Sequence, residues 1–591
     1  ALPPVQAAAG YGAISGNTLT LVVQEGAIPA PSGGDIDVTG TVLRIPQLNV
    51  KPATLAVQLK TSSEVEAAVA LMALKPFEVL KNAAFGADVA QGQAALAGQL
   101  TVPLIKGIQM EDVDFNITGD ITAASSTQLM AGKELRSKRM ALALTPAGLS
   151  LSGPVEVSGA RAAAVWRKAF GPENRGKSDI SGSVTINQAL LDAFDIDLPA
   201  KTISGSAQGD LKVALRQGKD PAFSVTSRME GLGLSVPAIG FSKSKTRRGT
   251  FNVAGTAGDV PKVTSLSVEA PGLTATGGSV SLTSAGALDR LRFDTLKVGA
   301  WLDSSATLIG RGKGRSVSVK LGGGTLDLSK SPFGTGASNA GTSGSGPIDM
   351  VLDQLKVTDS LSLNGVTAQL TQNGGLSGQF SGRLNGQAPI TGTVSPGPFG
   401  PTISVRAKDA GKTVMAAGLL EKASGGSLAL TLTSRRGQNS YDGAARITDM
   451  RVQSAPELAE LLSLVSVVGL LDQLSGPGIA FSDMRSDFIV QPGRITIGTS
   501  SAEGPSLGIT GEGTYYTDAK KIDLQGVISP IYFLNGIGQV LSRKGEGLFG
   551  FNFTLKGAID NPSVGVNPLS ILTPGALRGI FRKKTPSAPA N

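Results

Sequence analysis

The sequence contains no cysteine and no histidine. The absence of cysteine excludes disulfides, zinc–thiolate sites and thiol nucleophiles. The absence of histidine removes the side chain that most often serves as a general base or a metal ligand. A serine–lysine pair is a remaining route to nucleophilic catalysis, but no spacing of these residues singles one out. We therefore predict a protein that is not an enzyme and that needs no cofactor or metal.

Large side chains and charges are also scarce. Aromatic residues make up 4% of the chain and charged residues 17%, whereas glycine occurs 78 times. Such a chain has few bulky side chains for filling several compact cores, and short strands that each contact only their neighbours suit it better. A hydrophobic share of 41% argues against disorder of the whole chain. No run of 18 apolar residues occurs, so we predict no transmembrane helix.

Alternation of apolar and polar residues recurs from one end of the chain to the other. Clear examples are residues 35–42, 212–216, 265–269, 427–432 and 551–556. This period of two is typical of β-strands, and glycines separate the segments as turns and bulges require. No repeat of fixed length is visible, which disfavours a β-helix or a propeller. The sequence thus predicts a mainly β chain with one long sheet that exposes much apolar surface.

Four stretches are predicted to be helical. They are residues 63–82 with a break at Pro76, residues 187–194, residues 456–474 and residues 531–544. The stretch 456–474 is apolar on nearly every side, so it must be buried or lie against lipid. Two interpretations remain open for it: a buried helix that caps the end of the sheet, or a helix that touches lipid or plugs an apolar groove.

Composition shifts divide the chain into five predicted segments. Residues 334–347 form a glycine- and serine-rich flexible linker. The segments 1–160, 161–333 and 348–453 are predicted to be sheet. Residues 454–591 form a C-terminal region that contains the apolar helices.

The net charge is +9, with two basic clusters. The cluster at 243–248 is interpreted as a solvated loop. The second cluster follows an apolar stretch, and basic groups there are candidates for contact with anionic headgroups at a membrane surface. It consists of Arg578, Arg582, Lys583 and Lys584. We predict no nucleic-acid partner.

Two glycine motifs resemble nucleotide sites without the necessary context. Residues 171–178 match GxxxxGK[ST], but a phosphate-binding loop needs a strand before it and a helix after it. Here the helix-like segment 161–168 precedes the motif and a strand at 179–186 follows it. Residues 545–550 match GxGxxG and are followed by a strand instead of a helix. Both motifs are interpreted as turns.

The C-terminal region resembles a known family over residues 469–581, and residues 33–50 and 184–199 resemble weaker repeats of its body. The segments that carry the resemblance are GIAFSDM at 478–484, FIVQPG at 488–493, GEGTYY at 511–516, DLQGVISP at 523–530, LKGAIDNP at 555–562 and VNPLSILTPGALRGIF at 566–581. They are similar to the AsmA-like superfamily of bacterial envelope proteins, in its large YhdP-type branch.

This resemblance implies an elongated, curved antiparallel β-sheet, called a repeating β-groove, in a periplasmic protein anchored to the inner membrane. Its apolar concave face is expected to conduct phospholipids between the inner and outer membranes, and it implies no catalytic residues. The N-terminal transmembrane helix of the family is missing, since the chain begins at Ala1 without a leader. We interpret the sequence as a fragment, and its partners as phospholipids, the two membranes and unidentified envelope proteins.

The physical chemistry of lipids is consistent with such a groove. An acyl chain loses about 0.8 kcal/mol per CH₂ exposed to water, or on the order of 10 kcal/mol for a whole tail. Only a continuous apolar surface lowers that barrier. Our candidates for the lining are Phe551, Phe553 and Leu555 on one strand face, and Leu461, Leu464, Val465, Val468 and Leu471 in the apolar helix.

Two alternatives belong to other functional classes. One is a structural or adhesive extracellular β-protein, which the richness in glycine, serine and threonine suits. The other is a scaffold that regulates assembly of outer-membrane proteins without carrying lipid.

Overall fold

The computed structural model describes residues 3–75, 85–108, 110–312, 315–332, 346–436, 440–453, 455–465, 468–530, 550–559, 561–567 and 569–570. The prediction of a mainly β chain with antiparallel pairing is confirmed, since 32 strands belong to one hydrogen-bonded sheet and three form a small one. The chain divides into two compact units. Unit 1 comprises Ala1–Val236, Ser242–Pro271 and Gly278–Gly286, and unit 2 comprises Pro237–Phe241, Gly272–Gly277 and Ala287–Asn591.

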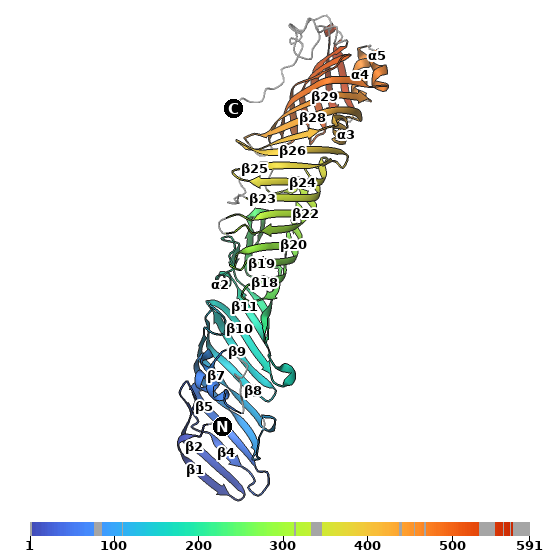
Figure 1. Ribbon diagram of the computed structural model, residues 1–591. Coiled ribbons are helices and arrows are strands. Elements are labelled where there is room, and N and C mark those ends of the chain that lie inside the picture. Colours follow the sequence, from blue (N-terminus) through green and yellow to red (C-terminus); the bar gives the residue numbers. More distant parts are fainter. Residues whose placement is uncertain are drawn as a thin grey trace. The chain divides into compact units, whose positions relative to one another are not determined.

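In unit 1 each strand of the large sheet is antiparallel to its neighbours (Figure 1). The strands are β1 (Gln6–Ser15), β2 (Thr18–Pro29), β3 (Asp35–Asp37), β4 (Val42–Ile45), β5 (Thr54–Glu64), β6 (Gln91–Pro103), β7 (Asp114–Ser126), β8 (Leu135–Thr145), β9 (Gly148–Val157), β10 (Ala160–Ala169), β11 (Lys177–Ile186), β13 (Ala207–Arg216), β14 (Lys219–Ser227), β17 (Thr250–Thr256) and β18 (Lys262–Ala270). The small sheet consists of β12 (Ile203–Gly205), β15 (Leu232–Val236) and β16 (Phe241–Lys243). The strand β19 (Leu273–Leu282) contributes residues to both units.

Two short helices of unit 1 follow strands that run in the same direction, β5 and β11, so they lie at one rim of the sheet. Helix α1 (Val65–Met72) is shorter than the predicted 63–82, whose residues 76–82 lie outside the described part of the chain. Helix α2 (Gln188–Ala193) confirms the prediction at 187–194. Asn187 caps it, because its Oδ1 accepts a hydrogen bond of 3.1 Å from the Leu190 amide.

Two predictions in unit 1 are wrong, one for a whole segment and one for a single residue of an otherwise exposed loop. Residues 161–168 form strand β10 instead of a helix, because pairing with β9 and β11 on both sides outweighs the local helical preference of alanine, arginine and lysine. In the basic cluster at 243–248, Lys243 is not solvated. It is only 3% exposed, and its Nζ donates hydrogen bonds to the carbonyl oxygens of Met229 at 2.8 Å and Leu232 at 2.6 Å.

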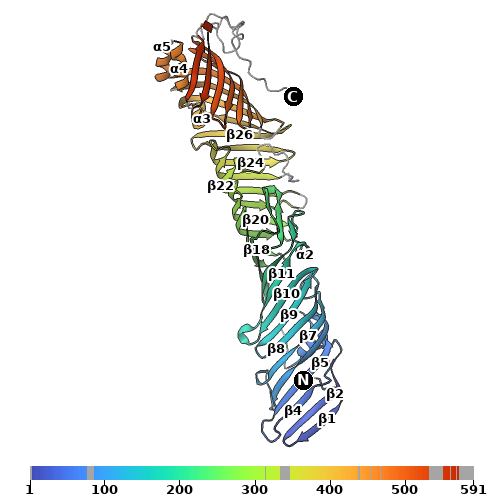
Figure 2. The same ribbon diagram turned by 180° about the vertical axis from the view of Figure 1, so that it is seen from behind.

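Unit 2 continues the same plan, seen from both sides in Figures 1 and 2. Its strands are β20 (Leu288–Val298), β21 (Leu302–Ile309), β22 (Ser318–Asp327), β23 (Pro347–Lys356), β24 (Ser362–Gln372), β25 (Leu376–Leu384), β26 (Ala388–Gly397), β27 (Gly400–Ala407), β28 (Lys422–Ser434), β29 (Tyr441–Gln453), β30 (Ile479–Gln491), β31 (Arg494–Glu503), β32 (Leu507–Tyr516), β33 (Lys521–Pro530), β34 (Phe551–Ala558) and β35 (Asn561–Asn567). Neighbours are antiparallel except β22 and β23, which are parallel. A parallel pair needs a long connection, and the segment between these strands contains most of the predicted linker 334–347, of which residues 334–345 lie outside the described part.

The helices of unit 2 follow strands β27 and β29. They are α3 (Ala410–Ala416), α4 (Pro456–Leu464) and α5 (Val468–Ser475). The prediction of one helix over 456–474 is wrong in this respect, because α4 ends at Leu464 with Val465 as its C-terminal cap, and α5 is a separate helix. Val465 is β-branched, and branched side chains disfavour the continuation of a helix. The predicted helix at 531–544 lies outside the described residues.

Within the described ranges, every helix is too short or too polar to cross a bilayer.

Candidate functional site

One face of the sheet in unit 2 carries an unbroken row of apolar residues. The row takes one cross-strand neighbour from each strand between β20 and β34. Its members are Leu291, Leu308, Val319, Ile348, Leu370, Gly378, Val394, Ile403, Leu432, Gly443, Phe488, Ile497, Gly513, Leu524 and Leu555. We call it the unit 2 row. Side chains alternate between faces along a strand, so the pairing register brings these residues to the same face.

A second row on the same face runs beside it. Its members are Phe293, Ala306, Leu321, Met350, Ala368, Phe380, Gly392, Val405, Leu430, Ala445, Ser486, Ser500, Gly511, Gly526 and Phe553. The only polar side chains in it are two serines, whose hydroxyl groups hydrogen-bond to each other at 2.7 Å. Neither row contains a charge, so an apolar ligand on these rows would not have to desolvate a charged group.

Three phenylalanines of unit 2 lie across glycines on this face. The rings of Phe380, Phe488 and Phe553 occupy the space that a Cβ would take at Gly392, Gly443 and Gly526 of the adjacent strands. A ring that covers a neighbouring glycine shields the backbone and keeps the wall apolar. The scarce aromatic residues therefore contribute directly to the apolar face.

The unit 2 row is shielded from solvent but not sealed. Leu370, Gly443 and Gly513 are buried, every other member is partly buried, and none is fully exposed. The inner face of a two-layer sandwich would be buried throughout, because side chains of the facing layer fill the space above it. Apolar area on this face consequently remains accessible to a ligand.

The opposite face of the same strands is polar and carries ion pairs. Lys320 Nζ lies 3.7 Å from Asp349 Oδ2 across β22 and β23. Asp483 accepts hydrogen bonds of 2.7 Å from both Arg446 Nε and Arg485 Nε. Burial raises the pKa of the Asp483 carboxyl, but the two guanidinium groups outweigh burial and hold that pKa below its ordinary value. The sheet is therefore amphipathic, with its charges on one side.

Unit 1 has an equivalent row from β6 to β18. Its members are Leu96, Gly119, Leu142, Leu151, Trp166, Ile180, Val213, Phe223, Gly255 and Val263. Gly255 is buried and the other nine are partly buried, so this row shares the intermediate exposure of the row in unit 2.

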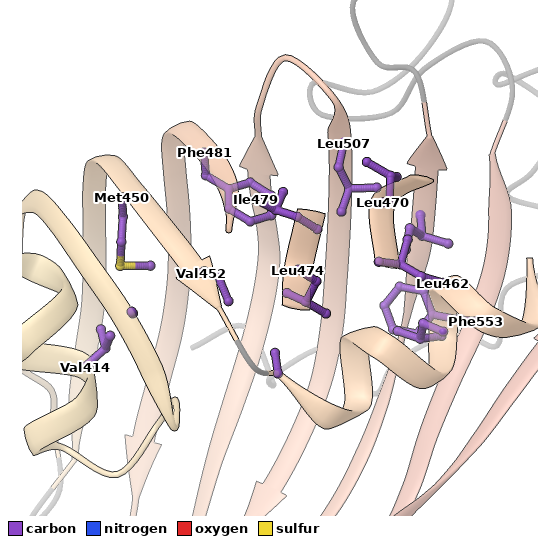
Figure 3. Packing of buried hydrophobic residues seen from close by; sticks show 14 of the residues in the cluster. Val414, Met450, Val452, Leu462, Leu470, Leu474, Ile479, Phe481, Leu507 and Phe553 are labelled. Atoms are coloured by element: carbon purple, nitrogen blue, oxygen red, sulfur yellow. The ribbon is translucent and has the colours of Figure 1, made fainter. Parts of the chain in front are cut away.

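At the C-terminal end of unit 2, helices α4 and α5 cover the apolar face. Figure 3 shows Leu462, Leu470 and Leu474 of the helices among Ile479, Leu507 and Phe553 of the strands, and these residues belong to one hydrophobic cluster. The side chains of Leu462, Ile479 and Leu507 are completely buried, at 0% exposure. The interpretation of this stretch as a buried helix that caps the sheet agrees with this packing.

The structure brings most of the predicted lining residues together in this cluster. Phe553 and Leu461 are buried at 6% and 4% exposure. Phe551, Leu555, Val465 and Leu471 pack against the cluster, and the register of β34 places its three predicted residues on one face.

The remaining predicted residues lie elsewhere. Leu464 is 51% exposed and outside the cluster. The side chain of Val468 and the basic residues Arg578, Arg582, Lys583 and Lys584 lie outside the described part of the chain.

Sequence reasoning missed most of the apolar face. Alternation identified individual strands, but a row is defined by pairing register, which local sequence does not specify. Leu462 was missed because all sides of the helix are apolar, so no side could be singled out as buried.

Across the described residues, no group of three or more acidic side chains is arranged to hold a metal ion. No protein-family model, curated protein or solved structure matches this chain.

Proposed function

We propose that this chain carries lipid without catalysing a reaction. Glycerophospholipids would move with their acyl chains against the apolar face and their headgroups toward solvent, between the inner and outer membranes of a bacterial envelope. The observation that supports this most directly is the unit 2 row, which is apolar at every position and partly exposed at all but three of them.

The dimensions of the row suit an acyl chain. Neighbouring strands are about 4.8 Å apart, so a row that crosses the strands from β20 to β34 is roughly 65 Å long. An acyl chain spans about half of a 30 Å hydrocarbon core, or about 15 Å. A lipid would therefore contact three or four strands at a time, and each step along the row would exchange one apolar neighbour for another.

The uniform apolar lining also predicts how selective the chain is among lipid headgroups. Leucine, isoleucine, valine and glycine offer no hydrogen bond to a headgroup, so we expect little headgroup preference. Membership of the AsmA-like superfamily, periplasmic location and anchoring to the inner membrane are part of the same proposal, and they rest on the sequence resemblance.

The test uses neighbouring residues on opposite faces of two strands. Benzoylphenylalanine is placed at Phe380 or Phe488 on the apolar face, and at Gln379 or Asp487 on the polar face as matched controls. After illumination with a radiolabelled phospholipid, we expect crosslinks at the two apolar positions and none at the controls. Mass spectrometry of detergent-free protein should also find co-purified phospholipid.

The two alternative functions predict a different result. Protein that contains no lipid and forms no crosslink at Phe380 or Phe488 would contradict lipid transfer. That result would favour an adhesive protein or an assembly scaffold.

A further inference from the structure

Three loops of unit 1, far apart in sequence, are tied together at one rim of the sheet. They are the segment 85–90, which contains a 3₁₀ turn (Ala87–Val89), the β7–β8 loop at 127–134, and the segment 194–202 after α2. Gln128 Nε2 donates a hydrogen bond of 3.0 Å to Asp88 Oδ2. Lys133 Nζ lies 2.5 Å from Asp195 Oδ2. The middle loop therefore contacts both of the others.

These loops hold six large apolar side chains in solvent. They are Phe85 at 40% exposure, Leu129 at 51%, Met130 at 38%, Phe194 at 42%, Ile196 at 47% and Leu198 at 42%. We call this set the loop patch. Scattered exposed leucines are ordinary, but apolar side chains gathered on adjoining loops are typical of an interaction site.

The surroundings of the loop patch are acidic. Five carboxylates lie in these loops and in α2 against two lysines and Arg136, whose Nε lies 2.7 Å from Glu134 Oε1, which gives a local charge of −2 in a chain whose net charge is +9. The carboxylates are Asp88, Glu134, Asp192, Asp195 and Asp197. A surface of this charge repels anionic lipid headgroups and attracts basic side chains.

We propose that the loop patch is a docking site for a partner protein that presents an amphipathic helix with apolar anchors flanked by lysine or arginine. The exposed phenylalanine, leucine and isoleucine side chains would form the apolar centre of the interface, and the surrounding carboxylates would form its polar rim. The acidic rim is the observation that favours a basic protein segment over a membrane. This inference does not depend on lipid transfer, because the loop patch and the apolar rows are different surfaces.

The test measures binding of two fluorescent amphipathic peptides of about 14 residues, one of leucine and lysine and one of leucine and glutamate. We expect the lysine peptide to bind the whole chain and the glutamate peptide not to bind. The double variant Phe194→Ser/Ile196→Ser should weaken binding of the lysine peptide by about tenfold or more. Asp197→Lys should weaken it as well, and added salt should reduce the difference between Asp197→Lys and wild type.

The matched control is Val351→Ser/Leu419→Ser, which removes two exposed apolar side chains of unit 2, at 61% and 71% exposure. This control should bind the lysine peptide like wild type. Equal binding by wild type, control and the loop-patch variant would overturn the proposal.

A vesicle-binding experiment distinguishes a membrane from a protein as the partner of the loop patch. Flotation with phosphatidylcholine or phosphatidylglycerol vesicles that is lost in Phe194→Ser/Ile196→Ser would assign the loop patch to a membrane and overturn the proposal. Lipid crosslinking at Phe380 should be the same in all these variants, so failure here and failure of lipid transfer are distinguishable.

Discussion

Replacing Leu432 by glutamate places one charge in the middle of the unit 2 row. Leu432 is partly exposed, and its cross-strand neighbours are Ile403 and Gly443. In the empty protein the new carboxylate keeps its water, so the fold should tolerate it. An acyl chain that crosses β28 would have to remove that water or leave the face.

The size of the effect follows from the cost of a charge in hydrocarbon. Insertion scales put it at about 2.5–3.5 kcal/mol for a charged side chain in the centre of a membrane helix. Each 1.4 kcal/mol changes a rate about tenfold, so a barrier raised by about 3 kcal/mol slows transfer roughly 100-fold. Leu432→Met, which keeps the position apolar, should transfer lipid within about twofold of wild type.

The assay is transfer of fluorescent phospholipid from donor to acceptor vesicles in the presence of the purified chain. Thr431→Glu is the matched control, because Thr431 is the next residue and lies on the opposite face with Ser404 and Ala444. We expect Thr431→Glu to behave like wild type. Unchanged transfer by a folded Leu432→Glu protein, or equal slowing by both glutamate variants, would refute the reasoning.

Three further predictions concern stability in urea or acid. Gly443→Ala should destabilise the protein by about 1–3 kcal/mol, because the new Cβ overlaps the ring of Phe488. Gly511→Ala should be neutral, because its Cβ would meet no atom closer than 3.9 Å. Equal urea midpoints for the two variants would contradict this packing. Leu462→Ala should cost about 2–5 kcal/mol and the exposed Leu464→Ala under about 0.5 kcal/mol, as measured by urea unfolding. The pKa of Asp483 is lower in the folded protein than in the unfolded chain, where it is near 3.8, so ionised Asp483 stabilises the fold above that pH and the contribution is lost as pH falls through the folded pKa. In Asp483→Asn the free energy of unfolding should therefore fall less steeply with acid than in wild type. An unchanged acid dependence would exclude this carboxylate as a cause of the acid sensitivity.

Helices α4 and α5 restrict how the apolar face can be used. They bury Phe553 and Ile528, so a lipid that moves along the face would meet covered surface at this end of unit 2. The uncovered part of the apolar face contains Leu432 and Phe488 of the unit 2 row and Phe380 of the second row, and all three are partly buried. The crosslinking positions and the glutamate substitution all lie in this uncovered part, where a lipid would meet them.

The sequence by itself determined the strand content and the two-sided character of many strands. In Phe551-Asn552-Phe553-Thr554-Leu555 the alternation already separates the apolar face from the polar one, because side chains on a strand point alternately to its two sides. Helix α2 was equally predictable, since Asn187 supplies a local capping oxygen that requires no distant partner.

The tertiary structure decided everything that depends on pairing between distant residues. Leu432 joins Gly443 and Ile403 only through register, and the segment 161–168 is a strand only because β9 and β11 flank it. The loop patch unites residues more than 100 positions apart. Backbone hydrogen bonds between strands are chemically alike at every position, so local sequence leaves the register open, and packing of the whole sheet selects it.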